Sequence, residues 1–517
     1  MHRLVTRSGV PSPLSHPNPA VSSSSRSFLP VSPLQAWSKA CAALAEGRGR
    51  GTLETTIGTN MMELNVYTAQ DAASRALSIL SEVENNYLTG KSDIRPDLDA
   101  YNAVMDAWAK SRVKEATDNV EQLLKRMVHL SKGGEEGKDE AVNGSREQWE
   151  TISPNIASFN SAIEAWSYSA KTGASEKAID ILDMLEREYS ATGNEKIKPT
   201  IRTVNQVINA LAKNIAIEQG NLNRRDDAWA AAEKSRELLE KMKTRYDETG
   251  DSDYKPDPVT YTTCVDAYAR VGHRKAAEAA EKLLEEMINT EGIFPNYRTF
   301  TAAITAWSKA PDPYRAEKLL TRMESMYENE LASGRKTRRA NSLKPNSRTY
   351  TAVVTALSRS RDAQKAQKSL KLLKKMLDMH RGGNEGMKPS QFTYNAVIEA
   401  CARTKGTGDQ QVKALKIAFA VRKAMSAAEG VYPNCITYIS LLKCVQNLMP
   451  RSEERNSVAK AVFLDARQAS VVNSRVLREF QMASDRHVFD ELAAECLDKQ
   501  GNVNADQIPS EWSKKAQ

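Results

Sequence analysis

Hydrophobic and polar positions along the chain follow one register that returns eight times. Each copy opens with a proline and a small polar residue, and an aromatic residue or valine stands five positions after the proline. The proline and aromatic positions are Pro96 and Tyr101, Pro154 and Phe159, Pro199 and Val204, Pro256 and Tyr261, Pro295 and Phe300, Pro345 and Tyr350, Pro389 and Tyr394, and Pro433 and Tyr438. Asn or Thr follows the aromatic position in seven copies, and Ile439 follows it in the last.

Each copy continues with apolar residues at a helical spacing. In the first copy Tyr101 is followed by Met105, Ala107 and Trp108, and the other copies keep this order with few exceptions. Positions i, i+4, i+6 and i+7 lie on one face of a helix. A second apolar-periodic segment follows in most copies, and the clearest examples are Asn119–Met127, Ala276–Met287, Ala316–Met323 and Ala366–Met376. The pattern therefore predicts a helix pair in every copy.

Helix pairs that repeat at a loose period predict an all-α solenoid of stacked helix–turn–helix units. The Asn/Thr positions are 39 to 58 residues apart, and the extra length lies in insertions such as 131–150 and 331–344, which we expect to be solvated loops. The predicted division is 31–97 for a degenerate first repeat, 98–449 for the array, 450–500 for a C-terminal helical cap and 501–517 for a polar tail. In the degenerate repeat, Leu34–Ala43 and Ala73–Val83 are the candidate helices.

The eight copies resemble the repeats of the pentatricopeptide repeat family. The resemblance covers roughly residues 98–449 and is carried by the proline-Asp/Asn, the aromatic-Asn/Thr and the closing A-x-x-L-L-x-x-M segments. It implies a right-handed α-α superhelix with the first helices along its inner surface. Tetratricopeptide repeats also stack helix pairs, but their Trp-x-x-Leu-Gly-x-x-Tyr opening does not occur in these copies.

The resemblance implies that each repeat recognises one RNA base with two side chains. The first recognition residue follows the aromatic position, and the second recognition residue follows the proline of the next copy. The pairs and the bases that the family pattern implies are Asn102 with Asn155 (cytosine), Asn160 with Thr200 (a pyrimidine), Asn205 with Asp257 (uracil), Thr262 with Asn296 and Thr301 with Asn346 (adenine), Thr351 with Ser390 (a purine), and Asn395 with Asn434 (cytosine). The implied site is 5′-CYUAARC-3′.

Helix capping is the competing interpretation of the residues after proline and of the threonines before the aromatic positions. Capping does not explain Asn or Thr at the first recognition position, because neither favours a helix interior. Two residues before the aromatic position, where the family places a side chain beside the base, this chain has Val259, Phe392 or Ile436 in some copies and Arg202, Arg298 or Arg348 in others. An arginine there can stack on a base, contact a phosphate or simply be solvated.

The composition argues against a metal site and a catalytic domain, and it does not point to a second function. A net charge of +8 permits a polyanionic partner without requiring one. The six cysteines and six histidines are scattered and build no metal site, so we expect reduced thiols and no cofactor. Neither the His-x-Glu and Cys-x-x-Cys motifs of an editing deaminase nor a clustered set of nuclease aspartates occurs. The prediction is a P-type array without a catalytic tail, and not an enzyme.

The first 45 residues contain no Asp or Glu and include a Ser22–Ser25 run. Such a composition is typical of an organellar transit peptide, here residues 1–30, with a plain disordered tail as the alternative. We expect a mitochondrial location, or a plastid one as the alternative. The sequence contains no run of about 18 apolar residues, so it predicts no membrane span. The expected protein is a monomer that binds single-stranded RNA in organellar RNA metabolism; the alternative is a scaffold that binds other organellar proteins.

Overall fold

The computed structural model describes residues 69–131, 152–169, 171–218, 225–332, 338–498 and 502–514. The segments predicted as a transit peptide and as the helix Leu34–Ala43, together with Cys41 and most of the insertion 131–150, lie outside the described residues. The regular secondary structure of the described residues consists of helices and one isolated bridge between Leu497 and Val503, which confirms the all-α fold class. None of its helices is long and apolar enough to cross a membrane.

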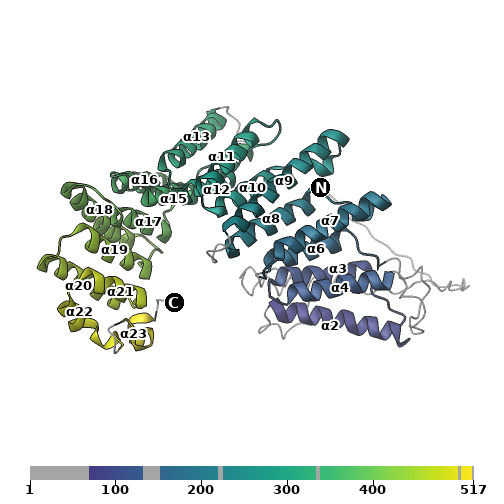
Figure 1. The fold of residues 1–517 in the computed structure, drawn as a ribbon, viewed down its shortest axis with the longest axis horizontal. Helices are drawn as coiled ribbons and strands as arrows, with labels where there is room; N and C mark the ends of the chain where they lie inside the picture. The colour runs from purple at the N-terminus through teal and green to yellow at the C-terminus, as the bar shows by residue number, and fades with distance from the viewer. Residues whose placement is uncertain are drawn as a thin grey trace, which may run out of the picture. The chain divides into compact units, whose positions relative to one another are not determined.

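Helix pairs follow one another along the chain as the register predicts (Figure 1). The pairs of first and second helix are α3 (Leu98–Ser111) and α4 (Ala116–Ser131), α6 (Ile156–Tyr168) and α7 (Ala174–Thr192), α8 (Ile201–Glu218) and α9 (Arg225–Thr249), α10 (Pro258–Val271) and α11 (Arg274–Asn289), α12 (Tyr297–Lys309) and α13 (Pro313–Ala332), α15 (Ser347–Arg359) and α16 (Lys365–Arg381), α17 (Gln391–Ala402) and α18 (Gly408–Ala427), and α19 (Cys435–Leu448) and α20 (Glu453–Gln468). Preceding them, α2 (Ala69–Leu88) includes the predicted segment Ala73–Val83 and packs on α3.

Two compact units make up the chain, residues 1–161 and residues 162–517. Within the second unit, each first helix contacts the first helix of the next pair, in the order α8, α10, α12, α15, α17 and α19. Each first helix also contacts its own second helix. Successive pairs therefore share one continuous core, which is the property that defines a solenoid.

In most copies the residue after the proline begins a helix because its side chain caps the free backbone N–H groups of the first turn. Asp257 accepts from the Thr260 amide at 2.8 Å, and the Thr260 side chain accepts from the Asp257 amide at 3.2 Å. Such a reciprocal capping box satisfies two donors that the helix leaves unpaired. At the other end of α10, Gly272 has a φ of 86°, which glycine adopts without strain and which ends the helix.

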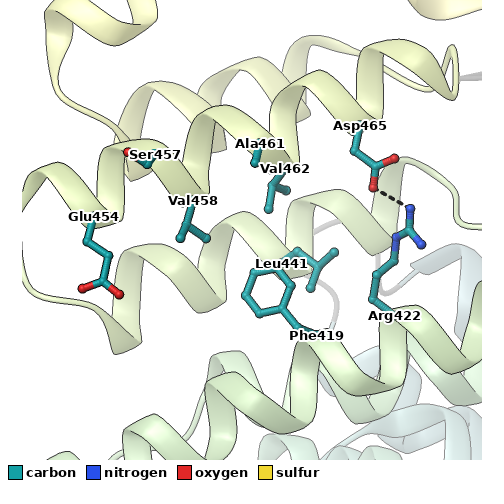
Figure 2. A pocket seen from close by; sticks show the side chains of 9 residues that line it. All are labelled: Phe419, Arg422, Leu441, Glu454, Ser457, Val458, Ala461, Val462 and Asp465. Carbon is teal, nitrogen blue, oxygen red and sulfur yellow. Dashed lines mark hydrogen bonds and ion pairs between the residues drawn. The ribbon is translucent and has the colours of Figure 1, made fainter.

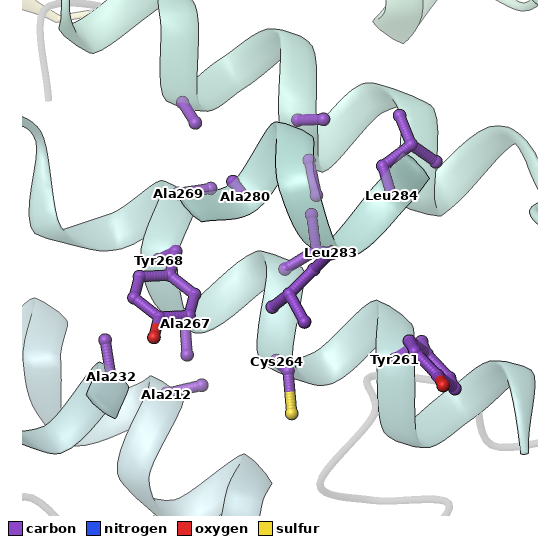
Figure 3. Packing of buried hydrophobic residues seen from close by; sticks show 14 of the residues in the cluster. Ala212, Ala232, Tyr261, Cys264, Ala267, Tyr268, Ala269, Ala280, Leu283 and Leu284 are labelled. Atoms are coloured by element: carbon purple, nitrogen blue, oxygen red, sulfur yellow. The ribbon is translucent and has the colours of Figure 1, made fainter. Parts of the chain in front are cut away.

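Small side chains on the first helices allow the close packing of neighbouring helices. The alanine that recurs at i+6 is fully or almost fully buried in α10, α12, α15 and α17, at Ala267, Ala306, Ala356 and Ala400. Figure 3 shows this packing around α10, where Ala267 and Tyr268 lie beside Ala212 of α8 and Ala232 of α9. Interaxial distance depends on the side chains at the contact, so alanine brings the first helices close together.

Cysteines serve this core as small apolar residues. Cys264, Cys401, Cys444 and Cys496 are buried free thiols, and Cys435 is partly buried. Burial raises the pKa of the Cys264 thiol to about 12, so this thiol stays protonated at neutral pH.

Part of the insertion 331–344, expected to be a solvated loop, is helical. Its residues Arg338–Leu343 form the short helix α14, in which Leu343 is fully buried and Ala340 nearly so. The Arg339 guanidinium lies 3.4 Å from the centre of the Phe294 ring. Two apolar residues three positions apart can bury one face of a short helix. The neighbouring arginines make this pattern difficult to recognise in the sequence.

Helices occupy the segment 450–500 that was predicted as a helical cap, and the folded part of the chain extends into the predicted polar tail. Helix α20 is the second helix of the eighth pair, and α21 (Ser474–Ala483) and α22 (Arg486–Ala493) form a further pair in which α21 packs on α19. Beyond them, the short helix α23 (Ser510–Ser513) packs on α20 through the buried Trp512. The Trp512 carbonyl accepts from the Val472 amide at 2.8 Å, so this part of the expected tail belongs to the folded core.

Candidate nucleic-acid interface

The two recognition residues of a pair come from successive first helices. The first recognition residue stands one position after the buried aromatic ring, and the second is the N-cap of the next first helix or stands at its start. Three predicted pairs are in direct contact, because in each the first residue donates a hydrogen bond to the second. They are Asn102 to Asn155 at 3.2 Å, Asn205 to Asp257 at 3.3 Å, and Asn395 to Asn434 at 3.1 Å.

The pairs that begin with threonine are connected through a third residue. Thr262 Oγ1 lies 2.7 Å from Thr299 Oγ1, and Thr299 also lies within 3.4 Å of the capping Asn296. The same arrangement links Thr301 to Thr349 and Asn346, and Thr351 to Thr393 and Ser390, with threonine–threonine distances of 2.8 Å. Each linking threonine is fully buried. Direct or bridged, six of the seven predicted pairs thus form polar connections between successive helix pairs.

Capping occupies only one of the two polar side-chain atoms of Asn296 and Asn346. Asn296 Oδ1 accepts from the Arg298 and Thr299 amides at 2.8 and 3.2 Å, whereas its Nδ2 has no partner among the described residues. Asn346 follows the same pattern, with Oδ1 accepting from the Arg348 and Thr349 amides. The capping interpretation is therefore confirmed for these residues, and each still has an N–H donor to offer a ligand.

Asn160 belongs to the first compact unit and Thr200 to the second. Asn160 is buried, and its Oδ1 has no hydrogen-bond partner in the described part of the chain. Thr200 contacts Thr203, whose hydroxyl accepts from the Thr200 amide at 3.3 Å. In the last unit Ile439 is buried and offers no polar group.

A row of exposed side chains lies at the second position of the first helices. Val259, Phe392 and Ile436 are exposed apolar residues, and Arg202, Arg298 and Arg348 at the equivalent position are also exposed. The Arg298 Nε donates to the Tyr297 hydroxyl at 3.3 Å, and this bond raises the pKa of the Arg298 guanidinium. Both classes of side chain are accessible to a base or a phosphate.

A basic residue recurs near the end of the first helices, eight positions after the first recognition residue. It is found at Lys110, Lys213, Arg270, Lys309, Arg359 and Arg403. Lys309 Nζ donates to the Arg270 carbonyl at 3.0 Å, and the Arg359 guanidinium donates to the Ser308 carbonyl at 3.4 Å. The basic groups therefore follow the seam between successive first helices. This row was missed in the sequence, although its fixed offset from Asn or Thr is a signal that could have revealed it.

Electrostatics along this row favour an anionic ligand. The pKa of Lys309 is lowered, first by desolvation and then by the neighbouring charges of Arg270 and Arg359. Asp266 partly offsets this effect, and it also forms an ion pair with Arg270 at 2.8 Å. Three cations from three successive first helices thus lie close enough to perturb one another, and a phosphate would relieve that repulsion.

A separate shallow cavity of about 370 Å³ lies between α18, α19 and α20. Figure 2 shows its apolar side chains Phe419, Leu441, Val458 and Val462, with the Arg422–Asp465 ion pair at one end and Glu454 at the other. No group of three His, Cys, Asp or Glu side chains in the described ranges is arranged to hold a metal ion.

Comparisons with known proteins agree with this organisation. A family model described as the pentatricopeptide repeat domain matches residues 246–308, 337–404 and 379–447. A pentatricopeptide repeat-containing protein of Arabidopsis thaliana is 24% identical over 263 residues, which are 51% of this chain and 35% of that protein. The chain thus spans about a third of the length of this relative.

Two solved structures are similar to the chain. The pentatricopeptide repeat protein PPR10 from maize shares 19% identity with a TM-score of 0.40, over 89% of this chain and 57% of that one. The structure of PPR10 in complex with an 18-nucleotide psaJ RNA element shares 16% identity with a TM-score of 0.34, over 90% of this chain and 54% of that one. The repeated register, the paired helices and the matches to the repeat model identify residues 246–308 and 337–447 as pentatricopeptide repeats.

Proposed function

We propose that the protein binds single-stranded RNA sequence-selectively, with one base recognised by each intact pair, and that its preferred site is 5′-CYUAARC-3′. The observation that carries this proposal is the position of the recognition pairs. Asn102 meets Asn155, Asn205 meets Asp257 and Asn395 meets Asn434, each across two successive first helices. Short side chains with donors and acceptors at regular intervals suit the Watson–Crick edges of unstacked bases.

Two other sets of side chains near these pairs also support an RNA ligand. The basic row that includes Lys309 and Arg359 follows the same seam between first helices, where it can neutralise phosphates. The exposed residues at the second helical position, such as Phe392 and Arg348, can stack on bases. The recognition pairs would then select the sequence, and the other residues would supply affinity that does not depend on it.

We infer a role in organellar RNA metabolism, such as transcript stability, processing or translation, and we place it in the mitochondrion, with the plastid as the alternative. Support comes from the acid-poor first 45 residues. Fusing these residues to a fluorescent reporter should direct it to one organelle; a reporter that stays diffuse would contradict the assignment. We also infer a non-catalytic role, so RNA incubated with the purified protein and Mg²⁺ should stay uncut.

The test of the main proposal is a binding assay at a stated salt concentration. RNA that contains 5′-CYUAARC-3′ should bind roughly tenfold or more tightly than a scrambled RNA of equal length and composition, since several hydrogen-bonded bases each contribute about 0.5–1.5 kcal/mol. Equal affinity for the two RNAs would contradict sequence selectivity. A selection experiment from a random RNA pool would then show which positions of the site are assigned correctly.

A second candidate function is a scaffold for other organellar proteins. The observation that favours it is the cavity between α18, α19 and α20, whose apolar lining includes Phe419, Leu441 and Val462. Apolar surfaces with a polar rim are typical of protein contacts. This candidate becomes the stronger one if neither the matched nor the scrambled RNA binds.

A further inference from the structure

Tyr432 stands out among the residues that precede the repeat prolines. The equivalent residues in the other copies are Arg95, Ser153, Lys198, Lys255, Phe294, Lys344 and Lys388, so Tyr432 and Phe294 are the two aromatic cases. Phe294 is covered by the Arg339 guanidinium, 3.4 Å from its ring centre. Tyr432 is 75% exposed, and its ring has no aromatic or cationic neighbour among the described residues. Its exposed ring has no structural role that these contacts can explain.

The backbone that carries Tyr432 is held in place on both sides. Gln391 Nε2 donates to the Tyr432 carbonyl at 2.6 Å. Val431 before it is buried, and the Asn434 amide after it donates to Thr437 Oγ1 at 3.1 Å. An aromatic side chain on an ordered backbone loses little conformational entropy when it stacks on a ligand, so Tyr432 is prepared for such a contact.

A cavity of about 510 Å³ lies at this ring, lined by Gln391, Tyr432, Pro433, Asn434, Ala469 and Val471. Its volume is within the range of small-ligand sites. The cavity connects three successive units, because Gln391 begins α17, Tyr432 precedes α19 and Val471 precedes α21. Asn434, the second recognition residue of the last predicted pair, lines it too. The cavity therefore adjoins the predicted site of the seventh base.

The next unit cannot recognise a base as the others do. Ile439, at the first recognition position, is only 5% exposed and has no polar side-chain atom. At the second position Asn473 is present and uses its Oδ1 to cap α21, accepting from the Arg475 and Val476 amides. A nucleotide beyond the seventh would meet an incomplete pair and, beside it, an exposed ring in a cavity.

We propose that the cavity at Tyr432 holds the base that follows the seventh recognised base, by stacking on the Tyr432 ring and without selecting its identity. This inference rests on the proposed function and on RNA running 5′ to 3′ along the chain. Every base has a π-face, so an aromatic platform tolerates any sequence. The RNA site would then be 5′-CYUAARCN-3′, with the last position unselective but needed for full affinity.

The experiment compares a seven-nucleotide RNA of the proposed site with versions extended at the 3′ end by A, C, G, U or an abasic nucleotide. Base–aromatic stacking contributes about 1–3 kcal/mol per base, so each base should tighten binding between about fivefold and about a hundredfold relative to the abasic extension. With 2-aminopurine as the eighth base, binding should also quench its fluorescence, which reports stacking directly.

Three variants assign the effect to the ring. Tyr432→Ala should remove both the gain and the quenching while leaving the affinity for the seven-nucleotide RNA nearly unchanged, and Tyr432→Phe should retain them because stacking does not need the hydroxyl. Tyr314→Ala, at a tyrosine that is 73% exposed on α13, is the matched control and should behave as the parent protein. Equal binding of abasic and base-bearing extensions, or a gain that persists in Tyr432→Ala, would overturn the inference.

The two proposals fail in different ways in this assay. If matched and scrambled seven-nucleotide RNAs bind equally but the extension still gains affinity through Tyr432, sequence recognition is wrong and the stacking site stands. If the matched RNA binds selectively and the extension gains nothing, the stacking site is wrong and the recognition pairs stand. If none of the RNAs binds, both are wrong.

Discussion

The first helices α10, α12, α15 and α17 stack in the same way as the C-terminal helices α19 and α21. The side chains at the contact between successive units are polar in the first group and apolar in the second. Between α12 and α15 the seam is polar, because Thr301 contacts the buried Thr349. Between α19 and α21 the equivalent positions are Ile439 and Val476, both buried in one apolar cluster. One backbone arrangement thus accommodates either a polar seam with groups for a ligand or an apolar seam that ends the array.

Aromatic side chains from α20, α21 and α23 pack together in this apolar C-terminal region. The Phe463 and Phe480 rings are stacked with their centres 4.2 Å apart, and Trp512 meets Phe463 edge-on at 6.1 Å. In a solenoid each unit helps to cover the core of its neighbour, and here the rings of Phe463, Phe480 and Trp512 do so from α20, α21 and α23. A unit that departs from the recognition pattern can therefore serve to cover the core.

The largest expected effect is on this closing region. Replacing Trp512 by Ala should lower local stability by about 3–5 kcal/mol, because a large buried ring is lost and a cavity remains. Hydrogen exchange of the full chain should show the loss of protection concentrated in α20 and α21. The control Tyr314→Ala changes an exposed ring and should alter stability by less than about 0.5 kcal/mol. Unchanged protection in α20 would show that the C-terminal segment is dispensable for closure.

The second prediction converts the apolar seam into a polar one. Ile439→Asn restores an asparagine opposite the capping Asn473, which is the combination present at Asn102 and Asn155. The variant should gain roughly tenfold selectivity for cytosine at the eighth position, at a cost of about 1–3 kcal/mol in stability because a polar group enters a buried site.

Binding to RNAs that differ only at the eighth base provides the measurement. Ile439→Val keeps the seam apolar and should show no preference. If Ile439→Asn folds and binds but discriminates no base, the second recognition residue at Asn473 is misplaced.

The third prediction concerns a single existing pair. Asn205→Thr places Thr opposite Asp257 and should shift the third base preference from uracil towards guanine by about fivefold, a difference of roughly 1 kcal/mol. Competition between RNAs with U or G at this position measures the shift. The reciprocal variant Thr262→Asn should move the fourth preference from adenine towards cytosine. A preference that stays with uracil in Asn205→Thr would show that this pair is wrongly assigned.

The smallest expected effect is that of one basic residue in the seam. Lys309→Gln or Arg359→Gln should weaken binding of matched and scrambled RNA alike, and each should reduce the slope of log affinity against log salt by about 0.7, the value for one phosphate contact on a single strand. A salt titration measures it. Lys374→Gln, at an exposed lysine of the second helix α16, is the control and should leave the slope unchanged. A change in base preference would contradict a phosphate role.

Much of the fold could be predicted because its signals are local. The proline, the capping residue and the aromatic residue lie within six positions of one another in each copy, and such short-range patterns specify helix starts and buried faces. Candidate recognition residues could be located for the same reason, as Asn205 and Asp257 illustrate, since both stand at fixed places in that register.

The remaining features of the fold and the site depend on contacts between residues that are far apart in the sequence. The sequence by itself determined the repeated helices, their caps and the first recognition positions. The family resemblance pairs Asn205 with Asp257, but only the tertiary structure shows that the two side chains are hydrogen-bonded across 52 positions. Only the tertiary structure also shows that Leu343 is buried within the insertion 331–344 and that Trp512 packs on α20. The physical reason is that stacking in a solenoid brings together residues from successive units. Insertions of variable length separate those residues along the chain, so no fixed spacing predicts their contact.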